Sequence, residues 1–336
     1  WETTSQTNIG LDAGFFDDKL SFTLDGFYKK TSDMLLPIPI PALSGIHNVE
    51  RVGGAPPFAF GNAGVMESRG LEAALNYRLT KGDFTFNAQA NISFVRNEVI
   101  SLAGGNPIPS NTVNSVPASR TEEGFPVAGF YGYKILGIFQ SYEEIANHAS
   151  QGPLDPHISD PSIAPRPRNF IAPGDFKFAD TNNDNVIDDQ DRTYIGNPLP
   201  DFTFGGSLNI AYKNFDLFTS FTGVNGNDII NSMNFFMKGY SLTNKSTEIL
   251  NAWTPENTNT DIPRVGVNRN NNMRFSDYWV EDGSYFRLQN LTIGYSIPET
   301  LLDRINADRV RVYVTVQNLF TLTNYTGMEP EVGSSV

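Results

Sequence analysis

Residues 180–191 carry oxygen-bearing side chains at alternate positions, a pattern typical of loops that bind a divalent cation. Counted from the first aspartate, side-chain oxygens stand at positions 1, 3, 5, 9 and 12, and position 7 offers its main-chain carbonyl. In chain order these residues are Asp180, Asn182, Asp184, Val186, Asp188 and Asp191. A hard cation needs several oxygens that converge on one point, and alternate positions of a tight loop supply them. The pattern predicts a structural calcium ion that stiffens this loop.

This loop departs from the usual calcium loop at two positions. Asn185 stands where a glycine normally makes the sharp turn, although asparagine tolerates the left-handed backbone conformation. Asp191 replaces the usual bidentate glutamate and has a shorter reach. Neither flank has the pattern of a helix, so the loop would stand alone. The alternative interpretation is a solvated acidic turn held by hydrogen bonds from aspartate and asparagine side chains.

Aromatic residues in two regions are candidates for ligand binding. Tyrosine and tryptophan combine a flat apolar surface with a polar group, which suits them to stack on sugar rings or peptide side chains. The candidates are Tyr131, Tyr133, Trp253, Tyr278 and Trp279. The same residues would equally suit packing beneath long loops, which need small cores of their own. The sequence leaves both interpretations open.

The sequence lacks the motifs of a hydrolytic enzyme. Its three histidines are scattered, and no His-Glu-x-x-His or Gly-x-Ser-x-Gly pattern occurs. Two pairs of adjacent acids, Glu122–Glu123 and Glu143–Glu144, could form a glycosidase pair only if folding placed them suitably. Adjacent acids in loops are usually solvated. We therefore expect a protein that is not an enzyme.

The composition indicates a β-rich chain with many turns. Among 336 residues, 12% are aromatic and 18% are charged, with 29 glycines and 21 prolines. A net charge of -13 argues against nucleic acid as a partner, because little basic charge is available to neutralise phosphates. Cysteine is absent, which excludes disulfide frameworks and thiolate metal sites.

Strict alternation of apolar and polar residues predicts strands with one dry face and one wet face. The clearest case is 84–94, where Phe84, Phe86 and Ile92 share one face and every residue of the other face is polar. Similar segments are expected at 7–11, 20–29, 71–79, 202–212, 215–221, 285–297 and 310–316. The alternation slips near Gln289–Asn290, which predicts a β-bulge.

The connections between these strands alternate between short and long. Short turns are expected at 16–19, 80–83, 213–214 and 298–308, the last with a helical turn. Long loops are expected at 31–65, 96–200 and 223–284, and the second contains the calcium-type motif. This layout is typical of outer-membrane β-barrels. We predict an all-β fold, an antiparallel transmembrane β-barrel represented by about eight strands. The alternative is a soluble β-sandwich that binds carbohydrate.

Several sequence blocks in a fixed order resemble one family of membrane proteins. The blocks are Trp1–Leu11, Asp25–Asp33, Ser68–Glu72, Phe130–Lys134 with Gly137–Phe139, Gly174–Pro200 and Val316–Phe320. They resemble the C-terminal barrel portion of TonB-dependent outer-membrane transporters of the SusC/RagA type. The resemblance covers nearly the whole chain, 1–336, and the block from Gly174 into Ile195-Gly196-Asn197-Pro198 is its most specific part.

The resemblance implies import of glycans or oligopeptides through the outer membrane of a Gram-negative bacterium. Such transporters have about 22 strands and a plugged lumen. A SusD-like surface lipoprotein captures the ligand, and the TonB-ExbB-ExbD system acts through the plug. Because the sequence shows neither plug nor first-half strands, we expect this chain to be the C-terminal part of a barrel embedded in outer-membrane lipid. A TonB-dependent receptor for siderophores or cobalamin would share the strand layout and is the nearest alternative.

Overall fold

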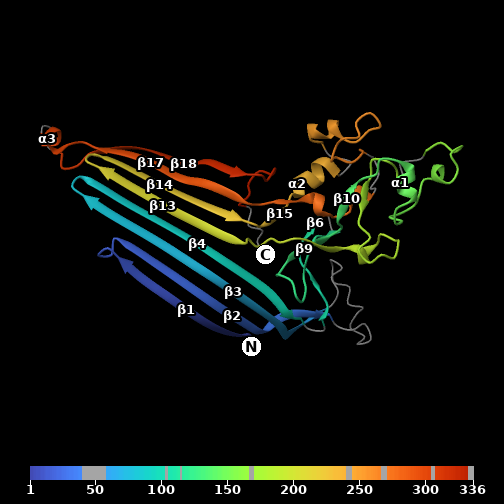
Figure 1. Cartoon of the computed structure of the whole chain (residues 1–336), viewed down its shortest axis with the longest axis horizontal. Helices are drawn as coiled ribbons and strands as arrows, with labels where there is room; N and C mark the ends of the chain where they lie inside the picture. Colours follow the sequence, from blue (N-terminus) through green and yellow to red (C-terminus); the bar gives the residue numbers. More distant parts are fainter. Residues whose placement is uncertain are drawn as a thin grey trace.

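The computed structural model describes residues 1–39, 58–102, 105–113, 116–165, 170–239, 244–265, 271–303 and 307–331. One long antiparallel sheet forms half of the molecule, and an assembly of loops stands at one end of it (Figure 1). The eight strands of the sheet are β1 Thr3–Phe15, β2 Leu20–Pro39, β3 Phe58–Lys81, β4 Phe84–Ser101, β13 Phe202–Tyr212, β14 Phe215–Asn225, β17 Tyr285–Ser296 and β18 Arg311–Thr323. They lie side by side in chain order, and each pairs with the next in antiparallel fashion.

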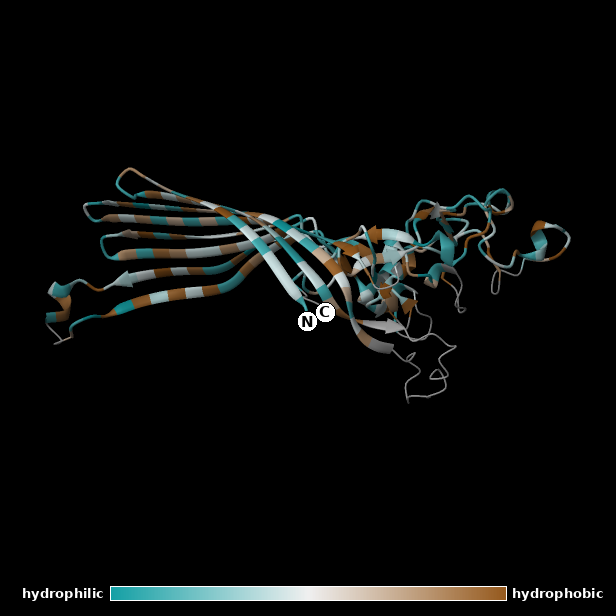
Figure 2. Cartoon of the chain, turned by 90° about the horizontal axis from the view of Figure 1, so that it is seen from below, coloured by the Kyte–Doolittle hydropathy of each residue, from teal (hydrophilic) through white to brown (hydrophobic). Residues whose placement is uncertain are grey.

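The two faces of the sheet differ in chemistry, because successive side chains of a strand point to opposite faces. Apolar and polar residues alternate along the strands in Figure 2. One face carries exposed apolar side chains, for example Ile9, which is 77% exposed, and Val314, which is 67% exposed. The opposite face carries residues such as Asn87, Asn209 and Thr292. We call these the apolar face and the polar face.

Two belts of aromatic rings bound the apolar face. Near the loops, Phe94 lies 5.4 Å from Phe202 and Phe204 lies 6.3 Å from Phe286, measured between ring centroids. The rings of this belt belong to Phe94, Phe202, Phe204, Phe221, Phe286 and Phe320. Near the turns, the second belt contains Tyr77, Phe86, Phe215 and Tyr295. Such belts on either side of an aliphatic band are typical of strands that cross a membrane.

Two glycines of the apolar face lie beneath rings of the first belt. A Cβ atom at Gly206 would come within 2.7 Å of the Phe221 ring, and one at Gly223 within 2.2 Å of the Phe204 ring. A phenylalanine that covers a cross-strand glycine shields the bare backbone. The glycines therefore allow the rings to lie flat on the sheet.

The predicted short turns are present between the strands. The turn at 16–19 joins β1 to β2, and Lys213–Asn214 joins β13 to β14, with Lys213 at a positive φ of 53°. A short helix, α3 Glu299–Leu302, begins the connection from β17 to β18, as predicted for 298–308. The register shift between Leu288 and Asn290 confirms the predicted bulge.

Several strands reach further toward the loops than the alternation pattern predicted. Strand β2 continues to Pro39 and β3 begins at Phe58, so the expected limits of a loop at 31–65 are wrong. The reason is backbone pairing that continues through register shifts between Thr31 and Leu35, where side-chain alternation is lost. Residues 40–57 of that predicted loop lie outside the described residues.

The loop after β4 folds into small sheets and short helices of its own. Its elements are β5 Ile108–Pro109, β6 Thr112–Val113, β7 Val116–Pro117, β8 Ser119–Thr121, β9 Gly129–Gly132, β10 Ile135–Ile138, α1 Tyr142–Ala146, β11 Phe176–Phe178 and β12 Thr193–Gly196, with 3-10 turns at Pro156–Ile158 and Asp189–Asp191. Strands β12, β9, β8 and β5 form one sheet, whereas β10 pairs with β11 and β6 with β7.

The loop after β14 has fewer regular elements and packs against the first. It contains β15 Asp228–Ile230, α2 Ser232–Asn234, β16 Val280–Asp282, a π-helical turn at Phe235–Gly239 and 3-10 turns at Thr247–Asn251, Asn271–Met273 and Asp277–Trp279. Strands β15 and β16 pair. Most buried apolar residues of the described chain belong to these two loops. Every helix among the described residues is too short or too polar to serve as a membrane span.

Candidate functional site

The calcium-type loop forms a compact turn between β11 and β12. Both carboxylate oxygens of Asp180 accept backbone N–H groups, from Asn183 at 2.7 Å and from Asn185 at 2.9 Å. Asn183 and Asn185 have positive φ angles of 62° and 67°, which asparagine tolerates. Asp184 accepts the N–H of Val186 at 2.8 Å. These bonds hold the oxygens of the motif on one short turn.

Asp191 closes the loop from its far end. Its side chain is fully buried, and its two oxygens accept the N–H groups of Thr181 and Asp188, each at 2.8 Å. Asp188 in turn caps the short helix Asp189–Asp191 by accepting the N–H of Gln190. Calcium loops usually have a glutamate at this position. The shorter aspartate reaches these two backbone N–H groups and so closes the loop.

The oxygen set of the loop suits a hard cation, since the carboxylate and amide oxygens other than Asp191 Oδ1 keep a lone pair beyond the one used in these bonds. Across the described residues, however, no three aspartate, glutamate or histidine side chains gather closely enough to form a metal site by themselves. The observed hydrogen bonds are those of the alternative interpretation, an acidic turn. Calcium binding remains a prediction.

Tyr131 is the candidate ligand residue that lies between two cations. The Arg120 guanidinium lies 3.2 Å from the centre of its ring, and that of Arg192 lies 5.0 Å away. Arg192 also donates to the Tyr131 carbonyl at 3.0 Å. The ring is half-buried on β9. Its π face is occupied by side chains of this chain, which indicates packing, and ligand contact would fall on its exposed edge.

Tyr133 and Tyr278 pack in a small core beneath the calcium-type loop. This core contains Phe176, Phe178 and Ile187. The Tyr133 hydroxyl donates to Asp189 at 3.2 Å, and burial raises the pKa of Tyr133 to about 12. Tyr278 is half-buried, and its ring centre lies 4.8 Å from that of Phe176. Burial also raises the pKa of Tyr278, so both phenols stay neutral.

Both candidate tryptophans are buried in the loop assembly. Trp279 is 1% exposed and packs edge-on against Phe235 at 5.1 Å. Trp253 is 8% exposed and donates its indole N–H to Gln140 at 2.9 Å. A Cβ atom at Gly174 would approach the Trp253 ring to 2.5 Å. This burial supports the packing interpretation for Trp253, Trp279 and Tyr133, and leaves Tyr131 and Tyr278 as the accessible candidates.

The adjacent acids considered for glycosidase chemistry have structural partners. Glu122 forms an ion pair with Arg120, and Glu123 accepts the N–H of Leu102. Glu144 accepts the N–H of Gln140 at the start of α1. Glu123 and Glu144 thus hold loop backbone in place, and Glu122 neutralises Arg120.

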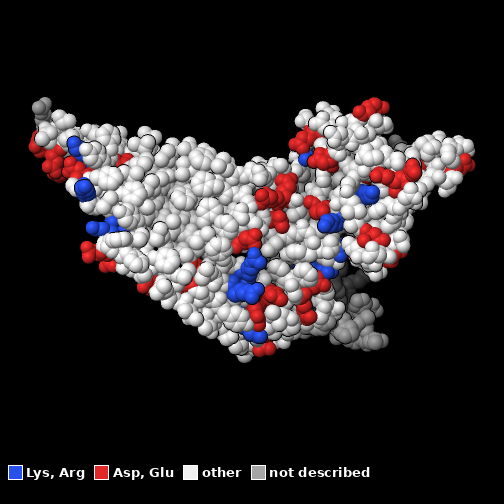
Figure 3. Space-filling view, in the orientation of Figure 1, with Lys and Arg blue, Asp and Glu red and all other residues white. Residues whose placement is uncertain are grey.

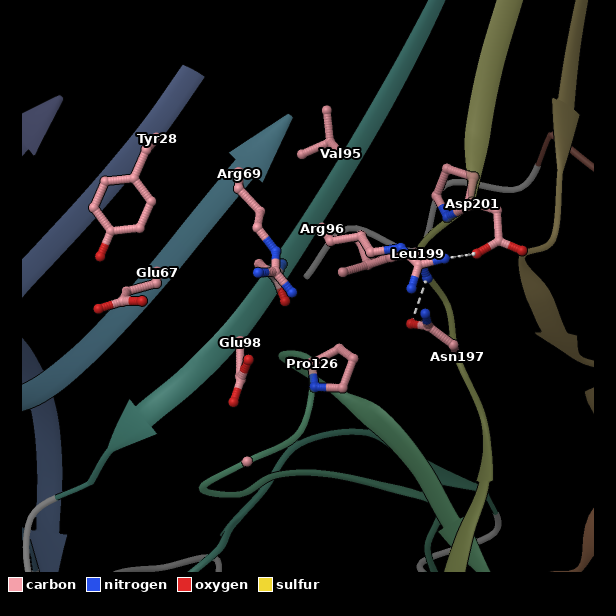
Figure 4. Close-up of a pocket in the computed structure, with 13 residues that line it drawn as sticks. Tyr28, Glu67, Arg69, Val95, Arg96, Glu98, Pro126, Asn197, Leu199 and Asp201 are labelled. Atoms are coloured by element: carbon pink, nitrogen blue, oxygen red, sulfur yellow. Dashed lines mark hydrogen bonds and ion pairs between the residues drawn. The ribbon is translucent and has the colours of Figure 1, made fainter. Parts of the chain in front are cut away.

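A hollow of about 300 Å³ opens where β2, β3, β4 and β13 meet the loops (Figure 4). Arg69 and Arg96 point into it from neighbouring strands, and Arg96 donates to Asp201 at 2.9 Å. Pro126 and Leu199 bound it on the loop side. Sequence reasoning missed this site. The available signal was the appearance of arginine and glutamate at positions where the alternation calls for apolar residues.

The polar face carries a second, shallower hollow of about 340 Å³. Its lining is dominated by amide and hydroxyl side chains, namely Gln89, Asn91, Thr203, Ser207, Ser220, Thr222 and Gln289. These groups both donate and accept hydrogen bonds, so the hollow suits a polar ligand that carries donors and acceptors. Further toward the turns, Arg311 and Asp216 form an ion pair on the same face. The polar face was predicted from the alternation alone.

Comparison with known proteins places this architecture in a family. Residues 1–152 match the family described as TonB dependent receptor-like, beta-barrel. Over 98% of its length the chain is 34% identical to TonB-dependent receptor P3 and 31% identical to TonB-dependent receptor P26, both from Formosa agariphila. Over its full length it is 28% identical to TonB-dependent receptor SusC of Bacteroides thetaiotaomicron. The chain spans about a third of the length of these relatives: the matched part is 31% of P3, 31% of P26 and 30% of SusC.

Solved structures give the same answer for the fold. A chain of the RagAB peptide transporter superposes with a TM-score of 0.75 at 28% identity, over 99% of this chain and 33% of that one. The RagAB peptide importer in its open-open state matches with a TM-score of 0.72 at 26% identity, over 99% of this chain and 32% of that one. The eight-stranded sheet and its loops therefore correspond to one segment of a larger barrel.

Proposed function

Because the chain belongs to the family of TonB-dependent receptor β-barrels, we propose that it forms part of the wall and of the outer loops of a SusC-like nutrient importer. Its strands cross the outer membrane of a Gram-negative bacterium. Its polar face lines the lumen, and its apolar face contacts lipid. Its part in transport is passive, since it supplies a wall, a polar lining and a docking surface.

The two-faced sheet is the observation that carries this proposal. Exposed apolar side chains cover one face between two aromatic belts, and mostly polar side chains, with Phe218 and Tyr313 among them, cover the other. A soluble sheet would bury its apolar face against a second layer, as every β-sandwich does. Both long connections described, after β4 and after β14, stand at the same end of the sheet (Figure 1). This arrangement fits a membrane wall with outer loops.

We further propose that a SusD-like lipoprotein docks on the two loops and that TonB-ExbB-ExbD acts through a plug in the remainder of the protein. The similarity to SusC and to a RagAB chain supports this assignment. The cargo is a glycan or an oligopeptide, consistent with amide and hydroxyl groups on the polar face. Calcium at 180–191 would stiffen the outer loop beside β12.

The test uses the full-length receptor that contains this chain, in its native host. Deletion of its gene should abolish growth on one class of polymer, either a glycan or a protein digest, and return of the gene should restore it. Purification from outer membranes should recover a lipoprotein in stoichiometric amount. Unchanged growth on every tested glycan and peptide, with uptake of an iron chelate or cobalamin lost instead, would overturn the proposal. Recovery of the receptor without a lipoprotein would overturn the proposal of a SusD-like partner.

A further inference from the structure

Charged residues form two rows at the border of the apolar face, next to the loops. Arg69 and Arg96 are directly opposite each other across β3 and β4, and Glu67 and Glu98 form the next pair toward the loops. These four residues continue the apolar face, because Leu71 and Phe94 form the adjacent pair on the other side of the arginines. Figure 3 shows basic and acidic side chains gathered together at this border, beside a wide area with few charges.

The arginine row is only partly compensated by carboxylates, because Asp201 pairs with Arg96 and the charge of Glu67 acts on Arg69 from the next row. Like charges directly opposite on a sheet destabilise it, and two guanidinium groups here face the same space. Arg96 bonds Asp201 through one nitrogen, at 2.9 Å, and keeps its other donors. Among the described residues, no carboxylate forms an ion pair with Arg69. Both side chains point into the hollow of about 300 Å³, which is open to the outside.

Three carboxylates also line the hollow, and two of them already have cationic partners. Lys30 forms an ion pair with Glu67 at 3.1 Å, and Asp201 is held by Arg96. Glu98 lies one row further from the apolar band than the arginines. A ligand that approaches from the band therefore meets Phe94 first and then the two arginines, beside which Asp201 is already paired with Arg96.

We propose that this outward hollow binds the phosphate of an outer-leaflet lipid headgroup, with Arg69 and Arg96 as its ligands. The inference rests on the proposed position of the sheet in the membrane. Lipid presents acyl chains and then phosphate in the order in which the sheet presents its aliphatic band, its phenylalanines and its arginines. Guanidinium groups match phosphate oxygens with paired hydrogen bonds. Tyr28 borders the hollow, and its hydroxyl is hydrogen-bonded to Glu67.

The experiment compares the purified full-length receptor with its Arg69→Gln/Arg96→Gln variant in detergent, with lipid A as the probe. Binding of lipid A, measured by native mass spectrometry, should weaken about tenfold for each arginine removed. Lipid A without its phosphates should bind both proteins equally weakly. Lys81→Gln is the matched control, because it removes a cation from the same face of β3 at the opposite border of the band. The Lys81→Gln variant should bind lipid A as tightly as the wild type does.

Two results would overturn the inference. One is equal binding of lipid A by the wild type and the double variant, when both migrate as heat-modifiable folded barrels. The other is full displacement of lipid A by inorganic phosphate at equal concentration, which would assign the hollow to free phosphate. Flotation of the wild-type receptor with liposomes tests the proposed function separately. Failure to float would reject the membrane position itself, whereas flotation with equal binding would reject only the lipid site.

Discussion

The guanidinium of Arg264 donates two parallel hydrogen bonds to the carboxylate of Asp175, Nε to Oδ1 at 2.7 Å and Nη2 to Oδ2 at 2.8 Å. The aspartate belongs to the loop after β4 and the arginine to the loop after β14. Asn272 donates to the same carboxylate at 2.9 Å and accepts the N–H of Phe176. The Asp175 side chain is fully buried and that of Arg264 is 14% exposed. This pair therefore fastens the two loops together.

Removal of Arg264 should loosen both loops while the sheet stays intact. Arg264→Met keeps the length of the side chain but leaves Asp175 buried beside fewer donors. Breaking a buried ion pair on one side costs about 3–5 kcal/mol. Hydrogen exchange should show loss of protection in 170–176 and 262–265, with β13 and β14 unchanged. Lys177→Gln is the control, because Lys177 and Glu144 form a partly exposed pair at 3.9 Å, worth about 1 kcal/mol or less. Equal effects of the two substitutions would contradict the prediction.

The hydrogen bond from the Thr326 N–H to Glu281 joins the loop after β14 to the chain after β18, and we expect this contact to depend on pH. Burial tends to raise the pKa of its carboxyl, but donors from Thr326, Asn231 and Asn234 outweigh burial and hold the pKa below its ordinary value of 4.5. A carboxylate with a lowered pKa stabilises the folded state fully above pH 4.5, and this stability is lost as the pH falls through the lowered pKa. We expect protection of the Thr326 amide at pH 7 and its loss on acidification below 4.5.

The Glu281→Gln variant tests this attachment. At pH 7 the protection factor of its Thr326 amide should be as low as that of the acidified wild type, and further acidification should change this protection factor little. Glu256→Gln, in an exposed turn, should behave like the wild type at both pH values. A Thr326 amide that responds to pH equally in the wild type and in Glu281→Gln would assign the response to another group.

The sheet could be predicted because its signal is local. Alternation at 84–94 indicated both the strand and the face of each side chain, and Phe204 and Leu208 lie on the apolar face as predicted. The resemblance to TonB-dependent receptors is confirmed by relatives and solved structures. Strand ends were less predictable. Pro37 and Pro39 suggested a loop, yet the backbone of β2 continues to pair beside β3.

The loop assembly could not be predicted, since its contacts join distant residues. Strands of two residues, such as β6, have no periodicity, and their pairing depends on chain closure. Trp279 was an equal candidate for ligand and core until Phe235 was seen against it. The pairing of Asp175 with Arg264 spans 89 residues and leaves no sequence pattern. Arg69 and Arg96 were visible as breaks in alternation, but only strand register shows that they are opposite each other.

Calcium binding by 180–191 should protect this loop from exchange and proteolysis. An ion at 100 times its dissociation constant adds about 2.7 kcal/mol of stability to the bound form. We expect slower exchange of the Asn183 and Asn185 amides with calcium than with a chelator. Asp184→Ala should abolish the difference, because it removes a central ligand. Asp160→Asn, in the same long loop but outside the motif, should leave the difference intact. Identical exchange of the wild type with calcium and with chelator would favour the acidic turn.

Adjacent residues in the middle of β13 give the sharpest test of the membrane wall. Leu208 lies on the apolar face opposite Ala88, and Asn209 lies on the polar face opposite Asn87. An arginine on the lipid face near the bilayer midplane costs about 2–4 kcal/mol, whereas one in a wet lumen costs little. In the full-length receptor, Leu208→Arg should lower the folded yield in liposomes and the denaturant midpoint, and Asn209→Arg should change neither. Equal tolerance of both would mean that the apolar face does not contact lipid, and the reverse order would place lipid on the polar face.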